Sequence, residues 1–311
     1  MRLTRGYQPS ALPPVALAIG NFDGVHLGHQ AILARVRARA AASGLDAALL
    51  TFEPHPRERL SPALAPTRIT TLREKLGLLR DAGIDRVHVL RFTRELASLS
   101  PREFATRVIV GALGARWVLV GGDFRFGAGR VGDVAHLRAL GAELGFEVAV
   151  MEPVEHAGLR VSSSAVREAL MEGRLERARA LRGTDFRILG RVVHGDKLGR
   201  KLGFATANVQ MRHNRPPLAG IFVVRMRIDG EAGERDGVAS LGVRPTVKAN
   251  GQAVLEVHLF DFSGDLYGRQ VAVRFLHKIR DEARYDGLEA LAAQIARDCE
   301  AARDFLARQG T

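Results

Sequence analysis

The chain has 311 residues and a formal net charge of +12, from 46 basic and 34 acidic residues. Its single cysteine, Cys299, excludes an intrachain disulfide framework and a cysteine-rich zinc site. We find no signal-peptide pattern and no apolar run of about 18 residues, so we expect a cytoplasmic protein without a membrane partner.

Short apolar runs alternate with longer amphipathic segments from residue 15 to residue 182. Strands are predicted at residues 15–20, 46–52, 86–92, 116–121 and 146–151. Helices are predicted at residues 29–44, 71–83, 100–114, 132–145 and 162–183. This order predicts an α/β domain whose mostly parallel sheet is covered by helices on both faces. In such sheets, ligands bind beyond the carboxyl ends of the strands.

The pattern changes after residue 183. Further strands are predicted at residues 189–195, 221–228, 254–262 and 270–279, with an amphipathic helix at 286–309. Glycine-rich and proline-rich turn signals separate these strands, which favours an antiparallel sheet or small β-barrel. We therefore expect two domains, residues 1–183 and residues 184–311.

The stretch "GNFDGVHLGHQ", Gly20–Gln30, follows the first predicted strand and opens the first predicted helix. A helix N-terminus attracts phosphate, and Gly24 and Gly28 would let a ligand approach the backbone. His26 and His29 could donate hydrogen bonds to phosphate oxygens. A zinc site would need a third ligand, and a P-loop pattern is absent from the chain. Two histidines with a purely structural role remain an alternative.

A second glycine pattern, "GAGRVG" at residues 127–132, matches the dinucleotide-binding expression, with Glu152 downstream. The residues "GDFRF" separate these glycines from the preceding strand, and a lone glycine pattern is weak evidence. We interpret this segment as a loop around Arg125 and Arg130.

The segment "GRVVHGDKLGRKLGFATANV", residues 190–209, is rich in glycine and basic residues. It is either a long basic loop or a loop that wraps a nucleotide phosphate. Thr206 and Asn208 offer oxygen ligands for Mg2+. On the predicted strand at residues 254–262, Glu256 shares a face with His258, and its carboxylate could accept a proton from a hydroxyl group. On the residues alone, a polar pair on a solvated strand is the simpler interpretation.

Four segments of the first domain carry a family resemblance. "GNFDGVHLGHQ" and "VSSSAVR" (161–167) resemble the two signatures of the nucleotidyltransferase superfamily, which has a Rossmann-like fold. "LTFEPHPRE" (50–58) and "VGGDFRFGAGRVGD" (120–133) resemble the FMN adenylyltransferase module of bacterial bifunctional riboflavin kinases/FAD synthetases. The resemblance implies catalytic roles for His26, His29 and Arg167. It implies nucleotide or phosphate binding by Gly20, Phe22, Asp23, Gly28, Ser162, Ser163 and Ser164, and flavin binding by His55, Asp123 and Phe124.

The second domain resembles the riboflavin kinase module of the same family. "GDKLGRKLGFATAN" resembles the kinase motif, and "GIFVV", "SLGVRPTV", "LEVHLFDFSGDLYG" and "FLHKIRDEARYDGLEAL" follow in the family's order. The resemblance implies that Thr206 and Asn208 bind the magnesium–nucleotide and that Glu256 is the general base. It further implies phosphate binding by Gly195, Lys197, Gly199, Lys201 and Gly203, and flavin binding by Arg280 and Tyr285.

One residue departs from the family motif. Ala205 replaces the usual proline, which would fix the backbone before Thr206. We expect weaker nucleotide or metal affinity at most, with activity retained.

The resemblance implies an enzyme that phosphorylates riboflavin to FMN and then adenylylates FMN to FAD. ATP would be the co-substrate and Mg2+ the cofactor. A flavin sensor without catalysis is disfavoured because the four predicted catalytic residues occur together. A nucleotidyltransferase for another acceptor is disfavoured by the kinase-like second half. Dispersed arginines and an aromatic content of 6% disfavour a nucleic-acid partner, whereas a homo-oligomer stays open.

Overall fold

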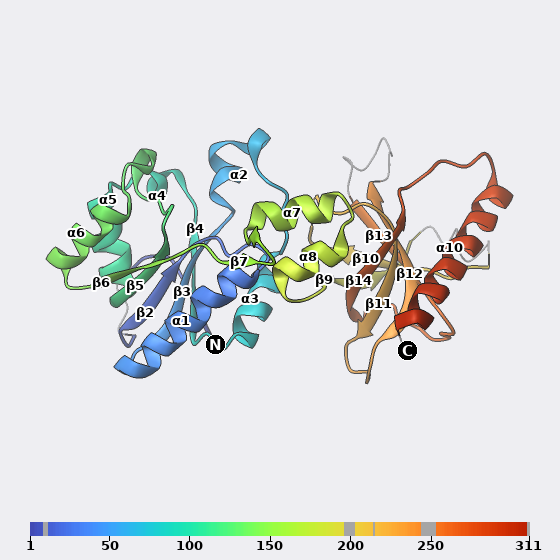
Figure 1. The fold of residues 1–311 in the computed structure, drawn as a ribbon, viewed down its shortest axis with the longest axis horizontal. Coiled ribbons are helices and arrows are strands. Elements are labelled where there is room, and N and C mark those ends of the chain that lie inside the picture. Colours follow the sequence, from blue (N-terminus) through green and yellow to red (C-terminus); the bar gives the residue numbers. More distant parts are fainter. Residues whose placement is uncertain (9–11, 196–202, 214, 244–252, 310–311) are drawn as a thin grey trace. The chain divides into compact units, whose positions relative to one another are not determined.

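The computed structural model describes residues 1–8, 12–195, 203–213, 215–243 and 253–309. Its chain forms two compact units (Figure 1). One unit comprises Met1–Pro66 and Leu72–Ser162, and the other comprises Thr67–Thr71 and Ser163–Thr311. No helix within the described ranges combines the length and the apolar character that a membrane crossing would require.

The first unit is built on a six-stranded parallel sheet, which confirms the predicted fold class. Its strands lie in the order β1-β4-β3-β2-β5-β6. They are β1 (Arg2–Arg5), β2 (Val15–Ile19), β3 (Asp46–Glu53), β4 (Arg86–Arg91), β5 (Ala115–Gly121) and β6 (Glu147–Met151). The central strands read as continuous apolar runs because helices cover the sheet on both faces. The edge strand β1 was not among the predicted elements, since it is short and rich in arginine.

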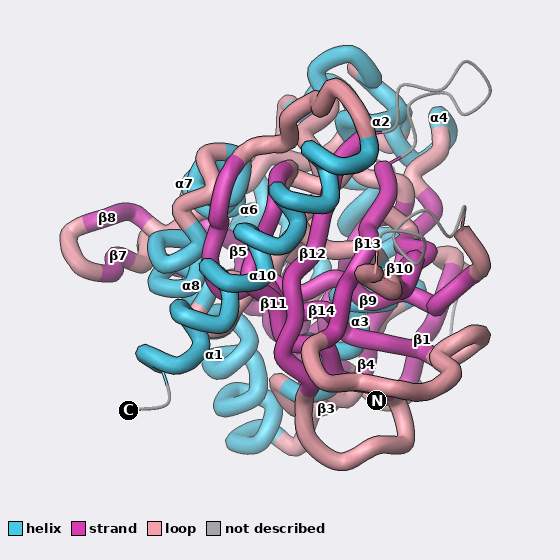
Figure 2. The backbone as a smooth tube through the Cα atoms, turned by 90° about the vertical axis from the view of Figure 1, so that its right-hand side faces the viewer, coloured by secondary structure: helices cyan, strands magenta, loops and turns pink. Residues whose placement is uncertain are grey.

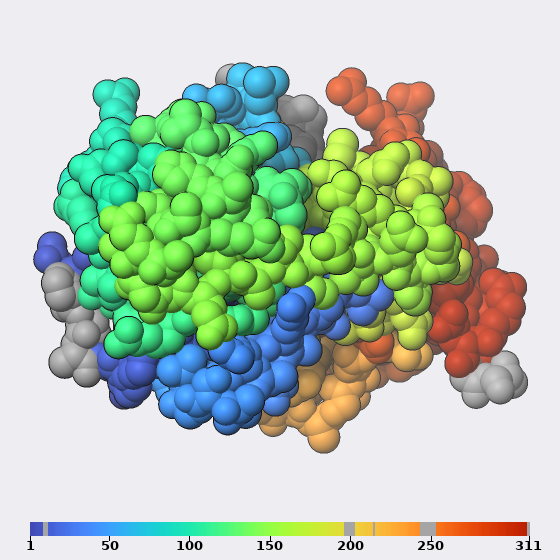
Figure 3. All heavy atoms as spheres, turned by 60° about the vertical axis from the view of Figure 1, so that its left-hand side comes forward, coloured from blue at the N-terminus to red at the C-terminus, as the bar shows by residue number. Residues whose placement is uncertain are grey.

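Helices cover the two faces of this sheet (Figure 1). α1 (Leu27–Ser43) and α3 (Leu72–Asp81) pack on one face through Leu33, Val36 and Leu79. The other face is covered by a π-helix (Phe104–Ala112) and by α6 (Val134–Leu144). Residues 101–151, drawn in shades of green, form one continuous outer surface (Figure 3).

The helix ends follow the sequence signals closely. Gly44 ends α1 in the left-handed conformation, with φ of 63°. Ser100 and Glu103 form the predicted capping box around Pro101 at the start of α5 (Pro101–Glu103). The prediction of one regular α-helix over 100–114 is wrong beyond Glu103, where the chain continues as the π-helix. The short helices α2 (Pro56–Leu60) and α4 (Arg94–Ser98) and a 3-10 turn (Pro62–Leu64) were not predicted.

The second unit contains a closed antiparallel barrel, the β-rich class expected for this half. Its strands follow the order β10-β13-β12-β11-β14-β9 around the ring. They are β9 (Phe186–Val193), β10 (Ala207–Met211), β11 (Gly220–Ile228), β12 (Arg235–Val243), β13 (Ala253–Leu259) and β14 (Gln270–Arg280). In the core, the ring centroid of Phe275 lies 5.7 Å from that of Phe186 and 5.3 Å from that of Phe222. β10 and the start of β12 lie in segments that the sequence pattern assigns to loops and turns.

Helix α10 (Leu288–Gln309) packs across the outside of β11 and β12 (Figure 2). Its buried residues Cys299, Ala302 and Leu306 contact Val223 and Val238. At its middle, Asp298 receives two hydrogen bonds from Arg280, Nε–Oδ1 at 2.9 Å and Nη2–Oδ2 at 2.6 Å. The apolar contacts and this bidentate pair together hold the helix on the barrel.

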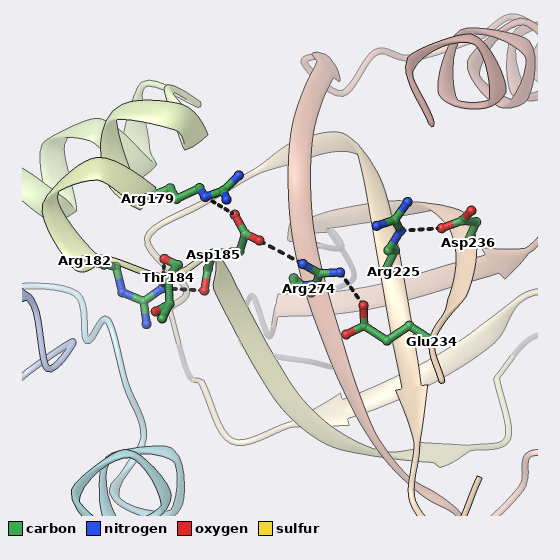
Figure 4. A network of polar contacts seen from close by, with 8 residues as sticks. All are labelled: Arg179, Arg182, Thr184, Asp185, Arg225, Glu234, Asp236 and Arg274. Atoms are coloured by element: carbon green, nitrogen blue, oxygen red, sulfur yellow. Dashed lines mark hydrogen bonds and ion pairs between the residues drawn. The ribbon is translucent and has the colours of Figure 1, made fainter. Parts of the chain in front are cut away.

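Two helices that we expect in the N-terminal domain group instead with the barrel. The predicted helix 162–183 is divided into α7 (Ser163–Met171) and α8 (Leu175–Arg182). Asp185 links α8 to the barrel, because its carboxylate faces Arg179 at 3.6 Å and Arg274 of β14 at 3.0 Å (Figure 4). The compact units therefore divide at Ser162, while the functional boundary at residue 183 stays a prediction.

The buried cysteine gives a test of the packing of α10. Burial raises the pKa of the Cys299 thiol to about 11, with the Asp298 carboxylate adding to the effect. At about pH 8 only about one thiol in a thousand would be ionised, and the thiolate is the reactive form. We expect native protein to resist Ellman's reagent and protein in concentrated guanidinium to react with one equivalent. Rapid modification of the native chain would contradict the packing of α10 described above.

Candidate active sites

Three predicted motif segments meet at one edge of the parallel sheet. β2 ends at Ile19, β3 at Glu53 and β5 at Gly121, and these strands are neighbours in the sheet. The histidine motif follows β2, His55 follows β3, and Asp123 with Phe124 follows β5. Parallel strands all end at the same edge, which is where ligands bind in open α/β sheets.

The backbone after β2 is strained and firmly held. Phe22 and Val25 have φ of 48° and 41°, the left-handed region that side chains disfavour, and Gly24 has φ of 84°. Phe22 is buried, with its ring centroid 4.6 Å from that of His29. A Cβ at Gly20 would lie 3.0 Å from the Phe22 ring. Such strain is retained where the surroundings fix it and is common at functional sites.

The two histidines form a stacked pair at the start of α1. His26 is the N-cap, and its Nδ1 accepts a hydrogen bond from the backbone N–H of His29 at 3.3 Å. Nδ1 therefore carries no proton, and neutral His26 is protonated at Nε2. The rings lie 3.7 Å apart at 17°. Asp23, next to this pair in the sequence, is buried as well.

Gly28 marks a close approach between the motif and Val161. A Cβ there would lie 3.2 Å from His26 Nδ1 and 3.7 Å from the carbonyl oxygen of Val161. Val161 is the first residue of "VSSSAVR", so the structure brings the start of this segment to the histidine motif. Ser162 follows it at the end of the first unit.

The remaining residues of that segment belong to the second unit. Ser163 and Ser164 open α7, and Arg167 donates from Nε to the carbonyl oxygen of Thr67 at 2.7 Å. The joint action of Arg167 with the two histidines stays a prediction.

His29 lies in an environment that disfavours its charged form. Burial lowers its pKa well below 6.5, and the nearby His26 and Lys75 lower it further. Within the described residues, His29 Nδ1 and Asn21 Oδ1 are buried without a hydrogen-bond partner. Unsatisfied buried polar atoms are rare, so two in one motif favour a ligand site.

Sequence analysis missed Lys75 and Asn21. Lys75 of α3 is 5% exposed, and its Nζ donates to the carbonyl oxygen of Asn21 at 2.7 Å. Lysine is rarely buried unless it is paired. A lysine on the inner face of the predicted amphipathic helix therefore indicated a buried polar contact. Asn21 stands inside the motif itself.

The predicted flavin residues of the first unit have local structural roles as well. His55 is the N-cap of α2, and its Nδ1 accepts from the N–H of Arg57 at 3.2 Å. Phe124 stacks on Phe126 with centroids 5.5 Å apart. Asp123 is exposed in the turn after β5. Their contact with a flavin stays a prediction.

The barrel carries two adjoining cavities. One, of about 360 Å3, is lined by the predicted residues Gly195, Thr206 and Asn208. The other, of about 220 Å3, is lined by Thr206, Glu256, Arg280 and Tyr285. Thr206 and His258 line both cavities, so the two spaces share a wall.

Strand register brings the proposed base next to a proposed metal ligand. Asn208 of β10 pairs with Glu256 of β13, and Glu256 pairs on its other side with Ser240 of β12. Directly paired residues present their side chains on the same face. Gly195 leaves room for the Asn208 amide, because a Cβ there would lie 2.3 Å from it.

Arg280 and Tyr285 form part of the wall of the smaller cavity. The Arg280 guanidinium is held by Asp298, which raises the pKa of Arg280, and lies 5.7 Å from the Tyr285 ring centroid. Gly203 is exposed with φ of 87°. The predicted phosphate ligands Lys197, Gly199 and Lys201 lie outside the described residues.

Comparison with known proteins explains why two sites occur on one chain. A family model described as FAD synthetase matches residues 8–165, and one described as riboflavin kinase matches residues 182–306. The protein thus combines a nucleotidyltransferase-type module with a kinase-type module.

Curated relatives join the two modules in the same way. A bifunctional riboflavin kinase/FMN adenylyltransferase of Pseudomonas fluorescens is 48% identical over 310 residues, 99% of this chain and 98% of the relative. Its Escherichia coli K12 counterpart is 44% identical over 308 residues, 98% of each chain. This chain belongs to the family of bifunctional riboflavin kinases/FMN adenylyltransferases.

A solved structure shares the fold over nearly the full length. A Streptococcus pneumoniae crystal structure, described as a macrolide-efflux protein, superposes with a TM-score of 0.82 at 29% identity. The superposition covers 97% of this chain and 99% of the other.

The depressed pKa of His29 makes the stability of the first unit depend on pH. In the unfolded chain His29 takes up a proton at about pH 6.5, whereas in the folded unit it does so only at much lower pH. Between these values the unfolded state binds more protons, so stability falls as the pH falls. We expect urea unfolding between about pH 7 and about pH 5.5 to show a weaker pH dependence in His29→Gln than in the natural chain. His156→Gln is the matched control, because His156 is exposed on the hairpin formed by β7 (Glu155–His156) and β8 (Leu159–Arg160). Equal slopes for His29→Gln and the natural chain would contradict the burial of a neutral His29.

Proposed function

We propose that this chain phosphorylates riboflavin to FMN in the barrel unit and adenylylates FMN to FAD in the parallel-sheet unit, using ATP for both steps. The observation that carries the proposal is the presence of two complementary sites on one chain. One offers hydrogen-bond donors and a helix N-terminus to a phosphate. The other sets a carboxylate beside hydroxyl and amide oxygens at two adjoining cavities.

In the kinase reaction, the ribityl 5′-hydroxyl of riboflavin attacks the γ-phosphorus of ATP. The new oxygen–phosphorus bond forms as the bond to the β,γ-bridging oxygen breaks, and ADP leaves. Glu256 accepts the hydroxyl proton as general base. The smaller cavity, which contains Glu256, would hold the flavin, and the larger one the nucleotide. Phosphoryl transfer depends mainly on such positioning and on charge stabilisation.

Two residues that line the larger cavity fit a magnesium ion. Thr206 and Asn208 supply the oxygen donors that this hard cation prefers. Among the residues that the structure describes, no group of three or more His, Cys, Asp or Glu side chains could hold a metal ion. Magnesium characteristically keeps several waters and substrate phosphates as ligands, so two protein oxygens suffice. When bound, it would neutralise phosphate charge.

In the second reaction, a phosphate oxygen of FMN attacks the α-phosphorus of a second ATP. The bond from the α-phosphorus to the leaving pyrophosphate breaks, and FAD forms. The attacking group is already an anion, so the site needs donors more than a base. Neutral His26 carries its proton on Nε2, because Nδ1 accepts the His29 N–H. We propose that His26, His29 and Arg167 stabilise the phosphate charge that develops as pyrophosphate leaves. The cytoplasmic location stays a prediction.

Separate substitutions should divide the two activities. Glu256→Gln removes the proton acceptor, and we expect FMN formation to fall by about a hundredfold while FMN-to-FAD conversion persists. The double change His26→Ala, His29→Ala should lower FMN-to-FAD conversion while FMN formation from riboflavin persists. Chromatographic separation of riboflavin, FMN and FAD after incubation with ATP and Mg2+ measures both steps. A folded variant that lost both activities would contradict the assignment of the reactions to separate sites.

Gly28→Ala tests the packing of the histidine pair. The added methyl group would lie 3.2 Å from His26 Nδ1 and displace the imidazole. Because small misplacements of catalytic groups slow reactions strongly, we expect FAD formation from FMN to fall about tenfold or more. FMN formation from riboflavin should not change. Gly77→Ala in α3 is the matched control, since a Cβ there meets no atom within 4 Å. Equal FAD formation by both variants would show that His26 is not so constrained.

A further inference from the structure

We propose that His258 is a positioning residue for phosphoryl transfer: it holds the backbone that precedes Thr206 and so fixes this residue between the two cavities. The inference rests on the kinase function proposed above. His258 was noted in the sequence only as the neighbour of Glu256 on one strand face.

The position of His258 joins the two substrate spaces. Among the residues that the structure describes, Thr206 and His258 line both cavities of the barrel. The ladder between β10 and β13 pairs Asn208 with Glu256 and Ala207 with Val257. Continued by one residue, this register places Thr206 across from His258. His258 also shares a strand face with Glu256, because side chains alternate along a strand.

One hydrogen bond ties His258 to the residue before Thr206. Its Nδ1 lies 2.9 Å from the carbonyl oxygen of Ala205. A carbonyl oxygen only accepts, so Nδ1 must be the donor, and a neutral His258 carries its proton there. This bond replaces the hydrogen bond to water that the exposed carbonyl group of Ala205 would otherwise make.

Aromatic contacts orient the imidazole for this bond. The Phe204 ring meets it edge-on, with centroids 5.6 Å apart at 85°, and Phe260 does so at 5.9 Å and 73°. Phe204 directly precedes Ala205, so one imidazole contacts both the side chain and the backbone of the segment that leads into Thr206. His258 acts through Thr206, whereas Glu256 acts on the substrate hydroxyl.

Two substitutions separate the hydrogen bond from the ring. His258→Phe keeps an aromatic ring but removes the donor, whereas His258→Asn keeps an amide N–H near the place of Nδ1–H. We expect His258→Phe to raise the KM for ATP and lower kcat of FMN formation, by about tenfold each, with the KM for riboflavin almost unchanged. His258→Asn should recover most of both losses. FMN-to-FAD conversion and the unfolding midpoint are measured on the same samples as controls.

A second substitution tests whether the hydrogen bond acts through the backbone. Ala205→Pro fixes φ at residue 205 covalently, without removing its carbonyl group. If His258 restrains this backbone, Ala205→Pro should improve FMN formation more in the His258→Phe background than in the natural chain. A double-mutant cycle with kcat/KM for ATP measures this coupling.

The outcomes are distinct. A natural chain that made no FMN would overturn the kinase function itself. If the natural chain makes FMN, normal kinetics of His258→Phe would overturn the inference. Equal losses of kcat and of ATP affinity in His258→Phe and His258→Asn would also overturn it. So would a double-mutant cycle that shows no coupling between His258→Phe and Ala205→Pro. If His258→Phe fails to fold, His258→Gln replaces it. The longer glutamine side chain places its amide near the position of Nε2 and not of Nδ1, so it lacks a donor for the Ala205 carbonyl oxygen. Equal kinetics of the Gln and Asn variants would then overturn it.

Discussion

Backbone hydrogen bonds between β10 and β13 fix the register on which the kinase site depends. They place Asn208 opposite Glu256, and β12 adds Ser240 on the other side. A slip of one residue would turn Glu256 toward the opposite face of the strand and separate it from the oxygen ligands. Closure of the barrel prevents such a slip, because each strand is paired on both sides. The closed barrel therefore fixes the relative positions of Asn208, Glu256 and Ser240 in the kinase site.

The parallel-sheet unit positions its polar groups by the ends of its strands and not by strand pairing. Its adjacent strands end at one edge, and the strained turn after β2 leads directly into α1. The first turn of that helix and the His26–His29 pair then lie together. Close packing around Phe22 holds this backbone in place, and the buried ammonium group of Lys75 binds the carbonyl oxygen of Asn21. Both units thus use the geometry of strand ends or strand pairs to position small polar groups.

The sequence predicted most of this architecture because its strong signals are local. Apolar runs identified the central parallel strands, and capping residues located helix ends such as Ser100 and Gly44. β10 escaped prediction because it is short and carries the polar residues Asn208 and Gln210, and β12 because glycines and charged residues interrupt its apolar pattern. Pairing with both neighbours stabilises the two strands. The motif residues were recognisable, but Lys75 was not, since its role depends on a contact 54 residues away in sequence. The grouping of α7 and α8 with the barrel likewise follows from tertiary contacts that no local pattern encodes.

The link between α8 and the barrel bears on how the protein can be divided into working fragments. Arg182 donates to the carbonyl oxygen of Asp185 at 2.8 Å, and its guanidinium lies 5.7 Å from the Phe186 ring centroid. A barrel fragment cut at residue 184 would keep every strand but would expose the surface that α8 covers. A fragment that begins at Ser163 would retain that cover and carry Arg167 along with it. The cut that conserves the packing therefore lies about twenty residues before the predicted functional boundary at residue 183.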